Sequence, residues 1–339
     1  MTTLVVVGAG AIGCHVGGAL AASGAKVIFV ARSQRAADLD APGLVISDLE
    51  GRHDVITAGQ LTVVATPAEA AARITGPIVI LLAVKGGATL EAAATLGAAF
   101  PPGTPVISLQ NGVDNVARIA AAAPALAPLA GMVPFNVVLT GGEGAPLTAH
   151  RATSGALILQ DDAATRALLP AFEKAGLAAT LSADMVAVQW GKLLLNLNNP
   201  VNALSGLTLI EELRDRDYRR VLAALQDEAL AALKRAGLRP AKIGAAPPAL
   251  IPTILRLPTW AFTRIAAGML AMDPTARSSM ADDLSAGRIT EIDDLCGAVV
   301  RLSLAQGMTA PLNRAMVRLV GEAKTLTAPQ MLAALGLTR

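Results

Sequence analysis

The sequence predicts an α/β protein with two domains, and three observations support that fold class. A chain of 339 residues exceeds the usual length of a single domain. In its first half, short β-rich runs alternate with alanine-rich helical stretches, which is typical of a parallel sheet covered on both faces. After about Ser182, amphipathic helical periodicity dominates. We therefore expect a doubly wound domain over residues 1–181 and an all-helical domain over residues 182–339, with a cleft between them.

Turn residues separate the expected strands of the first domain. Two clear turns are Pro101-Pro102-Gly103 and Gly141-Gly142-Glu143-Gly144. In the second domain, the prolines at 247, 248, 252 and 258 are expected to divide the chain into separate helices. The expected strands span residues 4–7, 26–30, 61–64, 78–84, 106–109, 131–139 and 156–159.

Composition and charge argue against several classes of protein. Much of the hydrophobic content is alanine, so the core has to come from many close helix contacts and from the branched residues of the strands. The formal charge is only +2 and no basic stripe alternates with aromatic residues, so we expect no nucleic-acid partner. The run from Leu4 to Ala25 is apolar, but its six glycines fit a strand, a turn and a helix better than a membrane span.

The cysteines and the N-terminus indicate a cytoplasmic protein without a metal site. Cys14 and Cys296 have no metal-ligand spacing and make no disulfide framework, which agrees with a reducing compartment. The start of the chain has no basic n-region or Ala-x-Ala cleavage pattern of a secretory signal. We give His15, His53 and His150 no catalytic role, because they lack partners at metal or triad spacing.

The first functional motif is Gly8-Ala9-Gly10-Ala11-Ile12-Gly13, which follows the strand at residues 4–7. Dinucleotide binding needs a tight turn, a backbone that can approach a pyrophosphate, and a helix packed closely on its strand; three glycines at this spacing allow all three. A second expected strand, Lys26 to Val30, follows at the distance typical of a βαβ unit. The motif therefore predicts a Rossmann domain that binds a dinucleotide; the alternative is a glycine-rich turn without a ligand.

The end of the second strand predicts which dinucleotide is bound. NAD-binding proteins place an acidic residue there, whereas this chain has Ala31 and Arg32, with Arg35 one turn later. A guanidinium can pair with a 2′-phosphate through two parallel hydrogen bonds. We therefore expect NADP(H), although both arginines could be solvated loop charges.

Two further strands end in polar residues. The strand over residues 76–84 is followed by Lys85, and the strand over residues 105–109 by Gln110-Asn111-Gly112. Ligands of doubly wound sheets bind beyond the carboxyl ends of the strands, so Lys85 and Asn111 are expected to face the cofactor. Asn111 could contact the nicotinamide ribose or the substrate. The alternative is that both residues point to water, with Asn111 in a plain turn before Gly112.

The segment over residues 189–200 is the most unusual in the second domain. On one helix, Gln189, Lys192, Asn196 and Asn199 form a single polar line, and leucines occupy the remaining surface. A buried stripe of this kind is costly unless partners satisfy it. We expect it to line a cleft that holds a polar ligand, and the alternative is satisfaction by neighbouring backbone carbonyls.

Two helix starts near the end of the chain also carry polar groups. Ser279 with Asp282, and Thr290 with Asp293, fit helix-capping patterns. Glu291 lies in an expected first helical turn, where the helix dipole favours a carboxylate. Capping alone could therefore explain these residues.

Taken together, these residues resemble the ketopantoate reductase (2-dehydropantoate 2-reductase) family over nearly the whole chain. The resemblance implies NADPH-dependent reduction of ketopantoate to pantoate, on the route to pantothenate and coenzyme A. It implies Lys192 as the proton donor, Asn111, Asn196, Asn199 and Ser279 as substrate contacts, and Glu291 in the cofactor and active-site network. The matching features are the glycine motif, Arg32, Lys85, Asn111-Gly112, Trp190-x-Lys192-Leu193, Asn199-Pro200, Ser278-Ser279-Met280 and Thr290-Glu291-Ile292-Asp293.

The chain departs from the family pattern at two places. The interval from Lys192 to the Asn-Pro pair is one residue shorter than usual, so Asn198 or Asn199 could be the matching side chain; the polar line favours Asn199. Cys296 stands where an asparagine is expected. Alternative functions are the reduction of another 2-oxo acid by a β-hydroxyacid or opine-type enzyme, and a non-catalytic NADP(H) sensor.

The implied chemistry depends on Lys192. Hydride addition to a ketone leaves negative charge on oxygen, which an ammonium group can neutralise before it donates a proton. Burial would lower the pKa of Lys192 from about 10.4, whereas a nearby carboxylate such as Glu291 would raise it. The expected partner is a small-molecule 2-oxo acid, and the alanine-rich helices could pair with a second copy in a homodimer.

Overall fold

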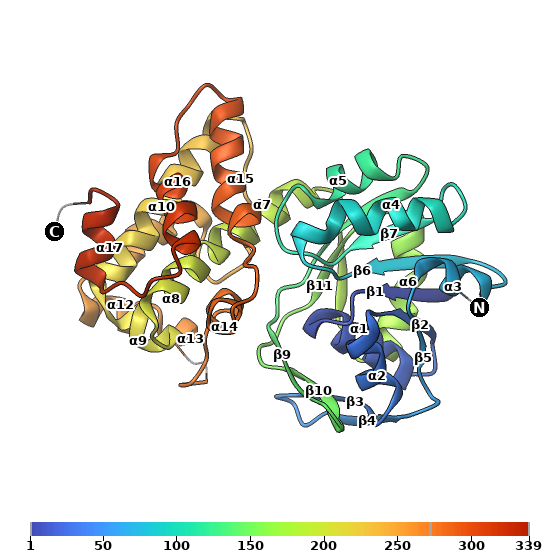
Figure 1. The fold of residues 1–339 in the computed structure, drawn as a ribbon. Helices are drawn as coiled ribbons and strands as arrows, with labels where there is room; N and C mark the ends of the chain where they lie inside the picture. The colour runs from blue at the N-terminus through green and yellow to red at the C-terminus, as the bar shows by residue number, and fades with distance from the viewer. Residues whose placement is uncertain (1, 271–272, 338–339) are drawn as a thin grey trace. The chain divides into compact units, whose positions relative to one another are not determined.

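The computed structural model describes residues 2–270 and 273–337, and the chain divides into two compact units, Met1–Met185 and Val186–Arg339 (Figure 1). Unit 1 contains an eight-stranded sheet of order β12-β11-β8-β7-β6-β1-β2-β5 and a four-stranded sheet of order β4-β3-β10-β9. The strands are β1 (Thr3–Val7), β2 (Lys26–Val30), β3 (Gly43–Asp48), β4 (His53–Thr57), β5 (Thr62–Val64), β6 (Ile78–Leu82), β7 (Pro105–Ser108), β8 (Ala127–Met132), β9 (Val137–Gly142), β10 (Ala145–Arg151), β11 (Leu157–Gln160) and β12 (Ala179–Ser182).

The centre of the larger sheet is parallel. Strand β1 pairs with β2 on one side and β6 on the other, and the parallel pairing continues from β6 through β7 to β8. The carboxyl ends of β1, β2, β6 and β7 therefore meet at one edge. This arrangement confirms the doubly wound fold class, with β11 antiparallel to β8 as its one reversal among the pairings of the described strands.

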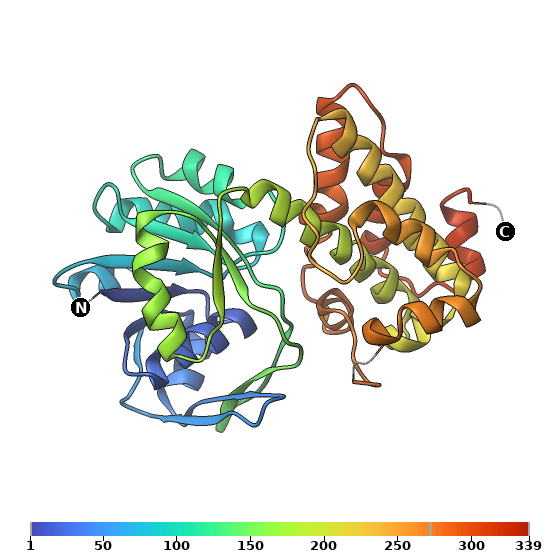
Figure 2. The same cartoon turned by 180° about the vertical axis from the view of Figure 1, so that it is seen from behind.

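Helices cover both faces of this sheet. One core joins α1, α2 and α6 to one face, and a second core joins α3, α4 and α5 to the other. Seen from behind, the yellow-green helix α6 stands in front of the strands (Figure 2). The helices of unit 1 are α1 (Ala11–Ala22), α2 (Ser33–Asp40), α3 (Pro67–Ala72), the short 3-10 helix η1 (Gly86–Ala88), α4 (Thr89–Ala99), α5 (Asn115–Ala122) and α6 (Ala163–Lys174).

Helix α1 packs between the two sheets (Figure 1). A Cβ atom at Gly17 would lie 2.6 Å from the ring of Phe29 on β2, and one at Gly18 would lie 2.5 Å from Ile46 on β3. The smaller sheet was not expected from the sequence. The expected strand over residues 131–139 is wrong, because the chain leaves β8 after Met132 and enters β9 in the other sheet at Val137. Pro134 lies in this crossing and cannot donate a hydrogen bond to a ladder.

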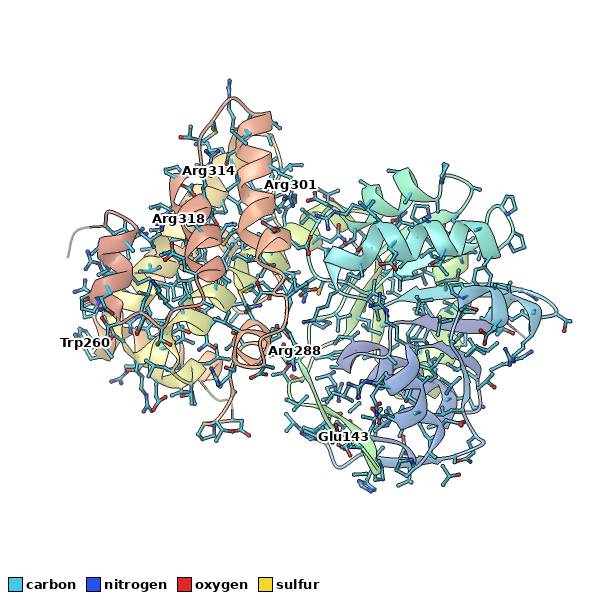
Figure 3. All side chains as sticks on the ribbon, in the orientation of Figure 1. Glu143, Trp260, Arg288, Arg301, Arg314 and Arg318 are labelled. Atoms are coloured by element: carbon cyan, nitrogen blue, oxygen red, sulfur yellow. The ribbon has the colours of Figure 1, made fainter. Side chains whose placement is uncertain are left out.

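Unit 2 is helical in its described residues, as expected. Its 20-residue helix α10 has buried residues between Tyr218 and Leu233, with exposed positions such as Asp227 among them, and packs against helices from both ends of the unit. Trp260 of α12 projects from the surface and is 76% exposed (Figure 3). The helices are α7 (Met185–Asn196), which begins at the last residue of unit 1, α8 (Asn198–Ser205), α9 (Leu209–Arg214), α10 (Arg216–Arg235), η2 (Pro248–Leu250), α11 (Ile251–Leu255), α12 (Thr259–Ile265), α13 (Ala267–Leu270), α14 (Ser279–Ser285), α15 (Ile292–Ala305), α16 (Pro311–Gly321) and α17 (Ala328–Ala334).

Within the described residues, no helix has both the length and the apolar character needed to cross a membrane. Cys14 and Cys296 are both buried and free.

Candidate active site

The three motif glycines of unit 1 have three different roles in the turn between β1 and α1. Gly8 has φ +101°, and a Cβ there would lie 2.8 Å from the backbone of Ala83 and Val84 after β6. A Cβ at Gly13 would collide with the carbonyl oxygen of Gly8. At Gly10, by contrast, a Cβ would meet no atom within 4 Å. Gly8 and Gly13 therefore hold the turn tight, and Gly10 leaves space above it.

The N-terminus of α1 beside this space suits an anion. Its N-cap residue is Gly10, which has no side chain to cap the helix, and its first turn contains no acidic residue. The first amide groups and the positive end of the helix dipole are thus available to a phosphate. The turn fits the pyrophosphate of a dinucleotide, which needs both an open approach and free N–H donors.

Arg32 and Arg35 lie beyond β2 at the same edge of the sheet. The side chain of Arg32 is 86% exposed and lies 3.8 Å from Glu91 of α4, while Arg35 lies 3.6 Å from Asp38. Exposed ion pairs of this length contribute little to stability. Arg32 can therefore exchange Glu91 for a phosphate at small cost.

Lys85 and Asn111 follow the neighbouring strands β6 and β7. Lys85 is exposed at the start of η1, and Asn111 is partly buried before Gly112, whose φ is +94°. Lys85, Asn111, Arg32 and the glycine turn all lie at the carboxyl ends of parallel strands. Every predicted site residue of unit 1 is therefore at the same edge of the sheet.

A buried hydrogen-bond network fixes the loop that carries Asn111. Gln110 donates to Thr89 Oγ1 at 2.7 Å, and Thr89 donates to Asn115 Oδ1 at 3.0 Å. Asn115 in turn donates from Nδ2 to the backbone oxygen of Asn111 at 2.7 Å. Gln110, for which no role was expected, is buried, and its side chain bonds within the protein. Its role in positioning Asn111 was not recognised from the sequence.

In unit 2, the expected single polar helix is two helices. α7 ends at Asn196, Leu197 forms a turn, and α8 starts at Asn198. Pro200 explains the break, because it has no N–H to donate to the carbonyl group four residues earlier. Gln189, Lys192 and Asn196 therefore share α7, whereas Asn199 belongs to α8. The expected burial of the surrounding leucines is found at Leu193, Leu194 and Leu197.

Lys192 is the most chemically distinctive group on α7. Its side chain is partly buried, and burial lowers its pKa from 10.5 to about 8. Asn196 lies one turn later on the same side of the helix and is 8% exposed. The preceding residue, Gly191, packs against the backbone oxygen of Ala241, where a Cβ would collide. This close contact fixes α7 beside Lys192.

Helix α14 starts one residue earlier than the capping pattern indicated. Ser278 is its N-cap and accepts a hydrogen bond from the N–H of Ala281 at 3.2 Å. Ser279 is therefore not the cap; it is exposed in the first turn, and its hydroxyl has no hydrogen-bond partner within the described part of the chain. Its side chain is available to a ligand.

Helix α15, by contrast, starts one residue later than the capping pattern indicated. Glu291, rather than Thr290, occupies the N-cap position and makes no side-chain capping bond. Glu291 is partly buried, while Cys296 on the same helix is fully buried, which raises the pKa of its thiol.

Asn199 and the start of α14 lie together in unit 2. The hydroxyl of Ser278 donates to the backbone oxygen of Asn199 at 3.2 Å, which brings Asn199 next to Ser279. The side chain of Asn199 has no hydrogen-bond partner among residues 2–270 and 273–337, whereas Asn198 donates to Glu212 at 3.0 Å. Of the two candidate asparagines, Asn199 is thus the one whose side chain is available.

Family models match both units. Residues 4–163 match the model described as ketopantoate reductase PanE/ApbA, and residues 184–324 match the C-terminal model of the same family. A 2-dehydropantoate 2-reductase of Halobacterium salinarum is 26% identical over 327 residues, which cover 94% of this chain and 97% of that protein. A 2-dehydropantoate 2-reductase of Caulobacter vibrioides is 28% identical over 234 residues, 67% of this chain and 71% of that protein.

Solved structures share the fold. A PanE/ApbA family ketopantoate reductase from Ralstonia eutropha JMP134 has a TM-score of 0.76 and 26% identity, covering 95% of this chain and 98% of its own. D-mandelate dehydrogenase, solved with NADH and anilino(oxo)acetate, has a TM-score of 0.73 at 19% identity, again over 95% and 98% of the two chains.

Proposed function

Since the chain belongs to the ketopantoate reductase family, which is a family of oxidoreductases, we propose that it reduces ketopantoate to pantoate with NADPH. The observation that carries this proposal is Lys192, a partly buried lysine whose pKa is lowered to about 8. A general acid is most effective when its pKa lies near the working pH. A lysine with a pKa of about 8 is mostly protonated at neutral pH and can still release its proton to the substrate.

The residues at the strand ends of unit 1 would hold the cofactor. Gly8 to Gly13 would bind the pyrophosphate, Arg32 the 2′-phosphate, and Lys85 and Asn111 the nicotinamide half, with Glu291 from unit 2 in the same network. When bound, the reduced nicotinamide supplies the hydride. The open space at Gly10 and the exposed guanidinium of Arg32 support this assignment.

Lys192 would neutralise the oxygen of the substrate's ketone and then protonate it. Asn111, Asn196, Asn199 and Ser279 would bind the carboxylate and hydroxyl groups of the substrate. These side chains donate hydrogen bonds without bringing a negative charge that would raise the pKa of the lysine. The available side chains of Asn199 and Ser279 support their part in this set.

The deciding experiment follows NADPH oxidation by the purified protein with ketopantoate as substrate. A panel of other 2-oxo acids, including the one that corresponds to mandelate, and a parallel series with NADH test substrate and cofactor separately. We expect the highest kcat/KM for ketopantoate with NADPH. A higher kcat/KM for another 2-oxo acid would identify that acid, rather than ketopantoate, as the substrate. Cofactor binding without any turnover would indicate a non-catalytic sensor. The same preparation gives the oligomeric state by analytical ultracentrifugation, where we expect a homodimer.

A further inference from the structure

A carboxyl group that the proposed mechanism does not use is buried in unit 2. Glu212 of α9 is 0% exposed. Its Oε2 accepts a hydrogen bond from Asn198 Nδ2 at 3.0 Å, and the nearby side-chain amide of Asn202 acts to lower its pKa. The charge that acts on it is another carboxylate, Asp215. An ionised carboxylate at this buried position would be costly, because no cation among the described residues acts on its pKa to compensate for the lost hydration.

Two buried oxygen atoms in this cluster have no hydrogen-bond partner among the described residues. They are Oε1 of Glu212 and Oδ1 of Asn198, whose other side-chain atoms already bond to one another. If Glu212 is ionised, both atoms are acceptors without a donor. A proton on Oε1 would supply that donor, and the pair would then have the bonding pattern of a carboxylic acid with a carboxamide, N–H to Oε2 and O–H to Oδ1. Burial raises the pKa of Glu212 from 4.5 to about 8, which agrees with a protonated group at neutral pH.

The cluster connects the segments that carry Asn199 and Ser279. Asn202 accepts a hydrogen bond from the backbone N–H of Ser278 at 2.9 Å and donates to the backbone oxygen of Leu207 at 3.1 Å. Ser278 also donates to the backbone oxygen of Asn199. The side chain of Asn198 therefore joins α8 to α9, and that of Ser278 joins α14 to α8. These two residues directly precede Asn199 and Ser279 in the chain.

We propose that Glu212 is a positioning residue: as a neutral acid paired with Asn198, it fixes α8 and thereby holds Asn199 and Ser279 for the 2-oxo acid. The substrate part of this inference rests on the proposed function. The acid–amide pair itself does not.

The pair predicts a specific pH dependence. A folded-state pKa above the unfolded value means that the native state binds more protons between about pH 4.5 and pH 8, so stability falls as pH rises through this window. The unfolding constant should increase by up to about tenfold per pH unit there. Among the residues that the structure describes, the titratable groups that interact with Glu212 are Asp215 and Tyr218, and α8 contributes none. The guanidinium group of Arg219 on α10 donates hydrogen bonds to the backbone oxygens of Leu213 and Arg214, the last two residues of α9.

The test compares Glu212→Gln with wild type, because glutamine offers the donors and acceptors of the neutral acid at every pH. We expect the variant to lose the rise of the unfolding constant between pH 5 and 8, measured by urea titration. It should keep its kcat/KM at pH 7 within about threefold. We expect the KM of wild type for ketopantoate to rise above pH 8, where Glu212 ionises, and the variant to lack this rise. The control is Glu211→Gln, an exposed capping residue beside it, which should titrate as wild type does.

Glu212→Met removes the pair and keeps the volume similar. We expect its KM for ketopantoate to rise about tenfold, while its Kd for NADPH stays at the wild-type value. If the unfolding constant of Glu212→Gln depends on pH as that of wild type does, Glu212 is not a neutral acid in the native state. This conclusion holds whether or not Glu212→Met folds. An unchanged KM in a folded Glu212→Met variant would overturn the positioning role. Absence of any 2-oxo acid reductase activity in wild type would overturn the proposed function and the positioning role, while the unfolding data still decide the protonation of Glu212.

Discussion

The glycine turn of unit 1 and the α7–α8–α14 region of unit 2 prepare for a polar ligand in opposite ways. In the turn, space and N–H groups come from the absence of side chains at Gly8, Gly10 and Gly13. In unit 2, the groups available to a ligand are side chains, and other side chains such as Ser278 hold them in place. Substitutions that add side-chain atoms should therefore weaken the glycine turn as a ligand site. Substitutions that remove side-chain atoms should weaken the α7–α8–α14 region.

The largest effect should come from removal of the Lys192 ammonium group. We expect Lys192→Ala to lower kcat for ketopantoate reduction by at least about a hundredfold, within the range usual for loss of a general acid. The Kd for NADPH, measured by fluorescence titration, should not change. Lys234→Ala, at an exposed lysine in the last turn of α10, is the control. A kcat within threefold of wild type would remove Lys192 from the mechanism.

The next effect separates two glycines of the same turn. Gly10 has φ −81° and open space around it, so Gly10→Ala should fold with an unchanged Tm. Its methyl group would occupy the approach to the helix N-terminus, and we expect the Kd for NADPH to rise at least about tenfold. Gly13→Ala should instead lower stability by about 1–3 kcal/mol, because its Cβ collides with the oxygen of Gly8. Equal losses of Tm in both variants would contradict this distinction.

Arg32→Ala tests how much a side chain of unit 1 contributes to the proposed recognition of the 2′-phosphate. Hydrogen bonds to a charged group contribute about 1.5–3 kcal/mol, so the KM for NADPH should rise at least about tenfold. The KM for NADH, which lacks the 2′-phosphate, should stay the same. Arg73→Ala, at an arginine in the C-cap of α3, is the control. A similar rise for both cofactors would argue against phosphate recognition.

The smallest effect is the pH dependence of wild type. Lys192 acts as an acid only when protonated, and its pKa is lowered to about 8. The kcat for reduction should therefore fall to half near pH 8 and by about tenfold at pH 9, while the reverse oxidation rises. Single-turnover measurements at saturating ketopantoate separate this from the effect of Glu212 on KM. A flat profile to pH 9 would contradict the role of Lys192.

The two regions also differ in how far the sequence predicts them. The strand, turn and helix around Gly8 to Gly13 are contiguous, so local spacing was sufficient to predict them. The sheet register then brings Arg32, Lys85 and Asn111 to the same edge without help from their side chains. The four-stranded sheet could not be predicted in this way, because it pairs Leu44 with Leu147, about 100 residues apart in the chain.

In unit 2, the residue types of the site were predicted, but not their arrangement. Ser278 and Ser279 are both able to cap a helix, and the choice depends on the contact between Ser278 and Asn199, which is distant in sequence. Glu212 follows Glu211 in an ordinary amphipathic pattern, and its burial against Asn198 leaves no local signal. The interruption of the helix at Leu197 could have been expected from Pro200, because proline lacks the N–H that continues a helix.

The position of α1 between two sheets also limits how the proposed preference for NADPH could be changed. Gly17 and Gly18 place the helix against Phe29 on one side and Ile46 on the other, with no room for a side chain at either position. Attempts to engineer acceptance of NADH should therefore leave the helix untouched and vary only the loop after β2. A library that also randomises residues 17 and 18 would be filled mainly with unfolded variants.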